Sequence, residues 1–493
     1  MLSLLRTGSR LSSIAAILGI AACGGGGGDD VAPPSNPPPP PPVTTTSTVA
    51  VGTITGFGSI FVNGVEFDTS GATFTIDDNP GVESDLQVGQ VVRVSGTIDD
   101  NGITGSADDV VFDNEVEGAI TSIDVATGEI VVLGQVIVID AATAFDDRFA
   151  DPSINGLAVG DLVEVSGFPD ASGVIRASRI EPGDANGDLE VRGEVSNLDA
   201  ANSHFDLNGL TVDYSGATLD DFGGGAPANG DFVEVHGSSV DANGVLIATR
   251  VEREDGPLDG VGNDVQVEVE GLITRFASAT DFDVAGQPVT TTSGTEFENG
   301  DAADLALDVK VEAEGFIDDS GVLVADKVSI RRENDTRIEA VVDDVDADAG
   351  TLTVFGIAVT VDDLTRFEDN GDADLRDFSL ADLAAGDFVE VRGVETPAGS
   401  DAILASELSR DDPDDETTVQ GEVDAESPEE SLVILGITVQ VDAQTQYRDA
   451  LDNAITAADF FAAVELGTLV EAKGADLGGN VLGAEGLEIE VEN

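Results

Sequence analysis

The clearest metal-binding pattern in this sequence is a short acidic segment near position 184. Asp184, Asn186 and Asp188 place side-chain oxygens at alternate positions, as at positions one, three and five of an EF-hand-like calcium loop. Position twelve, where such a loop needs a bidentate glutamate, is Val195, so a further carboxylate would have to come from elsewhere. Segment 369–374 is a weaker candidate of the same kind. We expect no cofactor: calcium is the one candidate, and accidental clustering of abundant acids is the favoured explanation of these segments.

Other chemistry has weaker support. His204 and His236 are the only histidines, and they fall on different predicted strands of one repeat, where they could be neighbours. Strand alternation turns Glu234 and His236 outward, which predicts exposed polar positions rather than a transition-metal site. The segment Gly56-x-Gly58 lies between strands with no helix behind it, which indicates a turn and not a phosphate loop.

No catalytic residue is predicted, and we do not expect an enzyme. The sequence has no serine elbow that opens a helix and no Cys–His pairing. A carboxylate pair could serve a glycosidase, but a pair cannot be selected among 97 Asp and Glu residues. A carbohydrate-active enzyme is therefore the least favoured alternative.

One carboxylate recurs along the chain, three residues before a glycine that closes an apolar strand. The recurring residues are Glu164, Glu234, Glu312, Glu390 and Glu471, with Arg93 in their place in the first copy. The flanking residues are apolar, so alternation predicts that these carboxylates point to solvent.

These glutamates belong to a long repeat with three markers in constant order. The closing glycines are Gly96, Gly167, Gly237, Gly315, Gly393 and Gly474. Upstream lies a hairpin glycine between two alternating apolar runs: Gly64, Gly134, Gly209, Gly286, Gly356 and Gly436. A threonine follows each hairpin: Thr73, Thr143, Thr218, Thr295, Thr365 and Thr445. Six copies of one module follow from this pattern.

The second copy shows the order of elements within a module. Strands are expected at 116–123, 129–133, 135–139, 162–166 and 174–180, with a short helix or turn near 153–157. Three strands, an irregular connection and two strands are typical of an OB-like five-stranded barrel, with a small open sandwich as the alternative. We predict an all-β protein of six tandem OB-like β-barrel modules behind a disordered Gly/Pro-rich tether.

The expected domain boundaries follow from the markers. They are a signal peptide at 1–22, a tether at 23–48 and modules at 49–115, 116–182, 189–253, 265–332, 337–410 and 417–493. The short acidic segments between modules at 184–188, 254–264, 333–336 and 411–416 indicate linkers, and hence beads on a string.

The charge of the chain is extreme, with 97 Asp and Glu against 21 Lys and Arg, and a net charge of −76. Nucleic-acid binding needs a basic footprint, so nucleic acid is excluded as a partner. An acidic surface has three ordinary explanations, which are solubility, adaptation to salt and binding of divalent cations. The single cysteine excludes an internal disulfide.

The N-terminus predicts export and lipidation. Arg6 and Arg10 precede an apolar stretch too short to span a bilayer, as in a signal peptide. The segment ends Ala21-Ala22-Cys23, which resembles the lipobox of bacterial lipoproteins and implies that Cys23 becomes the acylated first residue. A plain secretory signal is the alternative. Gly24 suggests the outer membrane of a Gram-negative bacterium, by analogy with lipoprotein sorting.

These features together resemble a family of bacterial envelope lipoproteins whose repeated module is known only as a domain of unknown function. The resemblance rests on Ala21-Ala22-Cys23, the five glycines behind it, and segment 54–65 that opens the first copy. It implies an envelope location and a repeated β-barrel, and it implies no activity.

We therefore expect a non-catalytic protein, held to the membrane by its lipid, that presents acidic β modules. These would be structural or would bind a protein or glycan partner at several points. The alternative is calcium-dependent adhesion, or a surface protein stiffened by calcium at its linkers.

Overall fold

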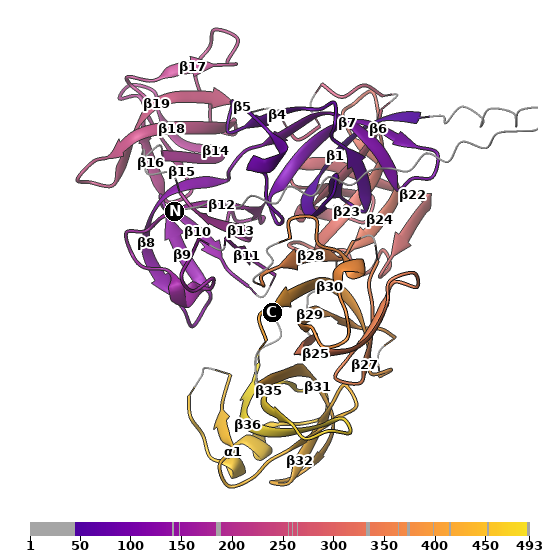
Figure 1. Cartoon of the computed structure of the whole chain (residues 1–493). Coiled ribbons are helices and arrows are strands. Elements are labelled where there is room, and N and C mark those ends of the chain that lie inside the picture. Colours follow the sequence, from indigo (N-terminus) through magenta and orange to yellow (C-terminus); the bar gives the residue numbers. More distant parts are fainter. Residues whose placement is uncertain are drawn as a thin grey trace, which may run out of the picture. The chain divides into compact units, whose positions relative to one another are not determined.

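The computed structural model describes residues 45–490, except for 141, 147, 184–188, 255, 259, 264, 332–335, 363, 372–374, 398, 414–415 and 451–452 (Figure 1). The predicted signal peptide, Cys23, most of the tether, and the calcium candidates Asp184, Asn186 and Asp188 lie outside the described residues.

Each of the six copies forms a closed ring of five strands. In the first copy these are β1 (Thr45–Phe57), β2 (Ile60–Val62), β3 (Val65–Asp68), β6 (Val91–Asp99) and β7 (Thr104–Phe112). They pair in the order β1-β2-β3-β7-β6 and back to β1, and only β3 and β7 are parallel. This ring confirms the predicted OB-like barrel.

The other copies repeat this order. The second has β8 (Val116–Asp124), β9 (Glu129–Val132), β10 (Gln135–Val138), β12 (Leu162–Pro169) and β13 (Ile175–Pro182). The third has β14 (Leu189–Asp199), β15 (His204–Leu207), β16 (Leu210–Asp213), β18 (Phe232–Val240) and β19 (Val245–Arg253). The fourth has β20 (Gln266–Ser278), β21 (Asp281–Val284), β22 (Gln287–Glu298), β23 (Lys310–Ile317) and β24 (Leu323–Ile330).

The last two copies follow the same scheme. The fifth has β25 (Thr336–Asp346), β26 (Thr351–Val354), β27 (Ile357–Thr360), β29 (Phe388–Glu395) and β30 (Ala402–Asp411). The sixth has β31 (Thr417–Ser427), β32 (Ser431–Ile434), β33 (Ile437–Gln440), β35 (Leu469–Asp476) and β36 (Val481–Ile489).

Short elements fill the connection after the third ring strand. The extra strands are β4 (Thr73–Ile76), β5 (Asn79–Gly81), β11 (Ala144–Phe145), β17 (Thr218–Asp220), β28 (Arg366–Asp369) and β34 (Gln446–Arg448). The helical turns are η1 (Glu83–Asp85), η2 (Ile154–Gly156), η3 (Leu380–Asp382) and the α-helix α1 (Ala457–Ala463). Among the described residues, no helix has the length and apolar character needed to cross a bilayer.

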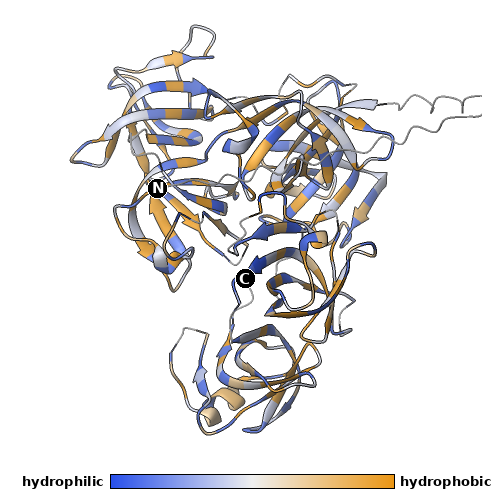
Figure 2. Ribbon diagram, viewed as in Figure 1, coloured by the Kyte–Doolittle hydropathy of each residue, from blue (hydrophilic) through white to orange (hydrophobic). Residues whose placement is uncertain are grey.

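Alternation of apolar and polar residues builds each barrel. In β9, Ile130 and Val132 are fully buried while Glu129 is exposed. Bands of hydrophobic and hydrophilic residues therefore alternate along the strands (Figure 2). Buried Val, Ile, Leu and Phe side chains fill the interior of each ring.

Two of the three sequence markers meet at one structural feature, and the third forms a separate turn. In copy 5 the closing Gly393 lies at a β-bulge opposite Ala405, where a Cβ would come within 2.1 Å of the Leu404 carbonyl oxygen. The marker Thr365 donates its hydroxyl hydrogen bond to the Ala405 carbonyl oxygen at 2.8 Å. The hairpin Gly356 has φ +78°, as a tight turn requires. The markers thus help to build the barrel.

The copies associate through their first strands, in pairs. In β1, Ile54–Phe57 pairs with β2 of its own barrel, which leaves the edge of Thr48–Val51 free. That edge pairs with β20 of copy 4. In the same way β8 pairs with β14, and β25 with β31. An open strand edge is a ready surface for pairing. The prediction of beads on a string is therefore wrong, because each barrel shares a 12-stranded sheet with a partner copy.

Candidate functional site

The recurring carboxylates lie at these junctions. Glu234 and Glu312 are only 3% and 2% exposed, so the prediction that they face solvent is wrong. Alternation does turn them away from their own barrel core, as predicted. However, pairing of the first strands widens the sheet at this point. Their neighbours are then the charged residues of adjacent strands and copies, rather than water.

The junction of copies 5 and 6 balances its charges. Arg337 on β25 lies 3.0 Å from the Glu390 carboxylate and 3.1 Å from that of Glu471, the recurring residues of both copies. It also lies 2.9 Å from Glu339. Burial alone would raise the pKa of Glu390, but Arg392 and Arg337 outweigh it, and the pKa is lowered. One guanidinium thus joins two barrels.

At the junction of copies 1 and 4 the cations compensate Glu270, whereas burial raises the pKa of Glu268 and of Glu312. Glu270 on β20 accepts a hydrogen bond from the backbone N–H of Thr53 on β1, at 2.8 Å, and lies 3.0 Å from Lys310. Burial opposes ionisation, but Lys310 and Arg331 lower the pKa of Glu270 to about 2.

Copy 3 departs from this pattern because a hairpin of copy 1 reaches it. Strands β4 and β5 are joined by Asp77 and Asp78, which have φ of 43° and 62°. Two consecutive left-handed residues make a tight turn, for which Asp is well suited. The Asp77 carboxylate accepts a hydrogen bond from the backbone N–H of Asn114, which holds the turn in place.

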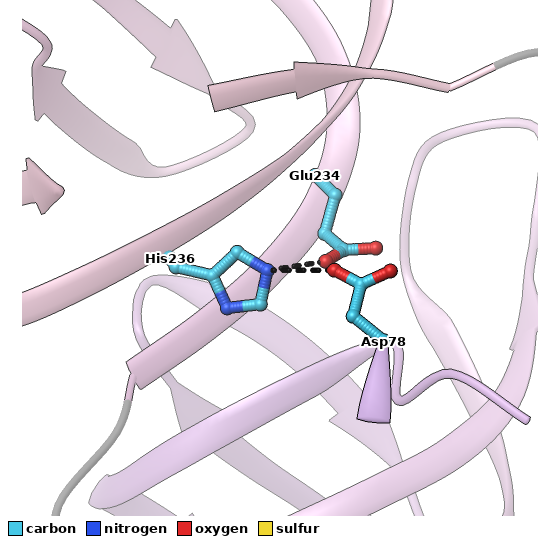
Figure 3. A group of neighbouring side chains, drawn as sticks. All are labelled: Asp78, Glu234 and His236. Carbon is cyan, nitrogen blue, oxygen red and sulfur yellow. Dashed lines mark ion pairs between the residues drawn. The ribbon is translucent and has the colours of Figure 1, made fainter. Parts of the chain in front are cut away.

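At the tip of this hairpin three potential metal ligands converge (Figure 3). The Nε2 atom of His236 lies 2.5 Å from a Glu234 carboxylate oxygen and 3.7 Å from an Asp78 carboxylate oxygen. The three ligand atoms all lie within 4.8 Å of one another. Glu234 and His236 come from β18, whereas Asp78 comes from the hairpin of copy 1, more than 150 residues earlier.

Buried acids outnumber the bases around this cluster. Glu190 on β14 is 3% exposed and lies 3.6 Å from Nδ1 of His236. Burial and the carboxylate of Glu234 raise the pKa of Glu190 to about 10. Burial also raises the pKa of Asp77 to about 7. Further carboxylates that act on the cluster are Asp113, Glu115 and Glu254, and the nearby cations are Arg192 and Arg250.

The carboxylate of Glu234 raises the pKa of His236, against opposing effects of burial and of Arg250. Arg250 donates a hydrogen bond to Asp78, and its Nη1 lies 3.3 Å from Nε2 of His236. One oxygen of Glu190 is buried and accepts no hydrogen bond from any residue in the described part of the chain.

The other predicted site residues are dispersed. Asp369, from the weaker calcium candidate, accepts hydrogen bonds from Arg410 and from the backbone N–H of Leu375, so its carboxylate is engaged within copy 5. The Nδ1 atom of His204 lies 2.7 Å from the carbonyl oxygen of Asn202, in its own hairpin. Sequence reasoning assigned His236 to solvent and missed Asp78 and Glu190, because no local pattern shows which distant strand reaches β18.

The ring order and the sixfold repetition define the class, a tandem array of small closed β-barrels. The chain belongs to the family described as "Domain of unknown function (DUF5666)". The family model matches residues 50–110, 117–181, 192–252, 270–329, 338–409 and 420–488.

Comparison with other proteins adds little beyond the family. No curated protein matches the chain. A solved structure titled "drosophila Unr CSD456" matches with 14% identity, and covers 45% of this chain and 98% of that one. Its TM-score of 0.12 is too low to support an argument about fold or function.

Proposed function

We propose that this protein is a non-catalytic, lipid-anchored protein of the bacterial cell envelope, in the outer membrane, that presents paired acidic β-barrels as a scaffold. The observation that carries the proposal is the position of the Arg and Lys side chains. Most Arg and Lys side chains of the described residues lie within ion-pair distance of carboxylates, many at the junctions. The surface left for a partner is dominated by Asp and Glu.

Such a surface favours a basic protein partner, or a glycan reached through cations, bound at several barrels at once. Binding between exposed charges is screened at high ionic strength. Association of the lipid-free chain with isolated envelopes should therefore weaken as salt is raised from low to about physiological strength, where the Debye length is near 8 Å. Binding that is unchanged by salt would contradict an electrostatic role for the acidic surface.

The lipid anchor is tested through Cys23. Metabolic labelling with a radioactive fatty acid should mark the wild-type protein and leave the Cys23→Ser variant unlabelled. At salt high enough to screen the acidic surface, only the wild type should sediment with outer membranes. Two or more acyl chains give stable anchoring, whereas a protein without them is released. Equal labelling or equal sedimentation of both proteins would disprove the anchor.

Calcium-stiffened adhesion remains the second proposal, on the sequence pattern of Asp184, Asn186 and Asp188. A ligand at 100 times its Kd adds about 2.7 kcal/mol to stability when it binds only the folded state. A melting midpoint raised by Ca²⁺ over EDTA, but not by Mg²⁺ at matched ionic strength, would support it. Equal shifts of the melting midpoint with both ions would mean that the ions act only by screening charge, which would contradict a specific calcium site.

A further inference from the structure

We propose that Asp78, Glu234 and His236 bind one divalent transition-metal ion of the zinc class, which joins the β4–β5 hairpin of copy 1 to β18 of copy 3. This site is independent of the lipid anchor and goes beyond the scaffold role.

The donor set selects the kind of metal. One imidazole nitrogen and two carboxylate oxygens suit Zn²⁺ and its first-row neighbours, whereas Ca²⁺ and Mg²⁺ prefer oxygen alone. The three donor atoms lie within 4.8 Å of one another, so shifts of side chains suffice to bring them to about 2 Å from one ion. Three protein ligands leave one tetrahedral position for water.

The second observation is the placement of Glu190. A metal-bound histidine almost always donates its other ring N–H to a carboxylate, which fixes the tautomer that offers the free nitrogen to the metal. Glu190 lies on the Nδ1 side of His236, at 3.6 Å, while Glu234 and Asp78 lie at Nε2. The exposed fraction of Glu190 is only 3%, and one of its carboxylate oxygens accepts no hydrogen bond from the described residues.

A metal ion would also compensate the negative charge of the buried carboxylates in this cluster. An uncompensated charge is costly to bury, and here the carboxylates of Asp78, Glu190 and Glu234 share Arg250 and Arg192 with several other acids. A divalent cation at Nε2 of His236 neutralises two of them. Arg250 then leaves Asp78, and it keeps Asp220 and Glu252 as ion-pair partners.

The test uses a lipid-free chain that begins at residue 24. It contains two histidines and no cysteine, so a spectrum of the imidazole nitrogens shows only His204 and His236. Adding one equivalent of Zn²⁺ to ¹⁵N-histidine-labelled protein should shift the ring signals of His236 and leave those of His204 in place. Millimolar Mg²⁺ in both samples occupies the scattered surface acids. Movement of neither histidine, or of both equally, would overturn the proposal.

The Zn²⁺ affinity of variants, measured by calorimetric titration, then distinguishes metal ligands from residues that do not bind the ion. Loss of an outer partner of a metal site costs roughly 10–100-fold in affinity, so His236→Gln, Glu234→Gln and Asp78→Asn should each cost at least tenfold. His204→Gln is the matched control and should change affinity by less than about twofold.

Far-UV circular dichroism checks that each variant folds. Asp78 lies on a partly exposed hairpin tip, so Asp78→Asn should still fold, and its loss of affinity then reports the lost ligand. Arg250→Gln removes a competing cation and should tighten Zn²⁺ binding. A purely structural ion-pair cluster predicts that neither Asp78→Asn nor Arg250→Gln changes the affinity for Zn²⁺, and this result would overturn the proposal.

Discussion

The recurring glutamate of the module has different surroundings in copies 3 and 5. In copy 5, Glu390 lies against Arg337 and Arg392, and its pKa is lowered because these cations outweigh burial. In copy 3, Glu234 lies against His236 and near Glu190, whose pKa is raised to about 10 by burial and by Glu234 itself. The two glutamates occupy the same strand of their barrels, β18 and β29. The chemistry of the position therefore depends on the charged residues around it: in copy 5 both cations come from the same copy, whereas in copy 3 Asp78 of copy 1 adds a further carboxylate near His236.

The largest effect that separates the two regions should come from removing Arg337. Arg337→Gln leaves the carboxylates of Glu390 and Glu471 at the junction without their shared cation. Breaking a buried pair costs about 3–5 kcal/mol, and the partial exposure of this one places it near 3 kcal/mol of unfolding free energy. Urea denaturation followed by circular dichroism measures the loss.

The control for that variant is Arg275→Gln. Arg275 pairs with Asp281 and Asp283 on an exposed hairpin, where ion pairs contribute about 0–1 kcal/mol. If both variants lose the same stability, the Arg337 junction is no more than a surface ion pair and the balanced-junction interpretation is wrong.

The next effect tests the backbone that the copies share. A Cβ on Gly393 would meet the Leu404 carbonyl at 2.1 Å and the Ala405 Cα at 2.9 Å, both in the backbone. On Gly237 it would first meet the side chain of Leu246, at 2.4 Å. Side chains move more easily than backbone, so Gly393→Ala should cost about 2–3 kcal/mol and Gly237→Ala about 1 kcal/mol. Thermal melts rank the two, and a larger loss for Gly237→Ala would contradict the bulge geometry.

A smaller effect should come from the marker threonine. In copy 5 the Thr365 hydroxyl donates to the Ala405 carbonyl at 2.8 Å and accepts from the backbone N–H of Asp362 at 3.0 Å. Thr365→Val leaves both groups unsatisfied, which should cost about 1–2 kcal/mol. In copy 3 the Thr218 hydroxyl is exposed and lies 3.4 Å from the Thr249 carbonyl, so Thr218→Val should stay within about 0.5 kcal/mol. If both variants lose the same unfolding free energy, the marker threonine contributes equally in copies 3 and 5 and the proposed difference is wrong.

The barrel could be predicted from the sequence because its signals are local. The expected strands at 116–123 and 129–133 correspond to β8 and β9, and the turn near 153–157 contains η2. Hairpin glycines and alternating apolar residues act within a few positions, so the pattern records them directly.

The junctions and the His236 cluster could not be predicted in this way. The free edge of Thr48–Val51 in β1 is visible only once the barrel has closed, and its partner β20 lies some 200 residues away. Alternation correctly turned Glu234 out of its barrel, but it cannot distinguish water from a neighbouring copy. Asp78 belongs to copy 1, whose sheet is shared with copy 4 and not with copy 3, so local spacing cannot show that it lies beside His236 on β18.

The smallest effect concerns an acid of copy 6 that Arg337 does not fully compensate. Burial, and then Glu471 and Glu488, raise the pKa of Glu490 to about 7, against Lys473 and Arg337. The unfolded value is near 4.5, so the folded state holds a proton between pH 4.5 and 7 that the unfolded state has lost. The stability associated with this proton is present below pH 4.5 and is lost as the pH rises through 7.

Replacing Glu490 with Gln removes the charge at every pH. Glu490→Gln should therefore be no more stable than wild type at pH 4.5, and more stable by roughly 1 kcal/mol at pH 8, after discounting for solvent screening. Urea denaturation at both values measures the difference. Glu485→Gln, at an exposed position on β36 just before Glu490, controls for the loss of one negative charge from the chain as a whole. A gain that is equal at both pH values, or equal in both variants, would mean that general charge repulsion and not the local cluster destabilises this end of copy 6. The contrast between compensated and uncompensated carboxylates would then hold only for copies 3 and 5.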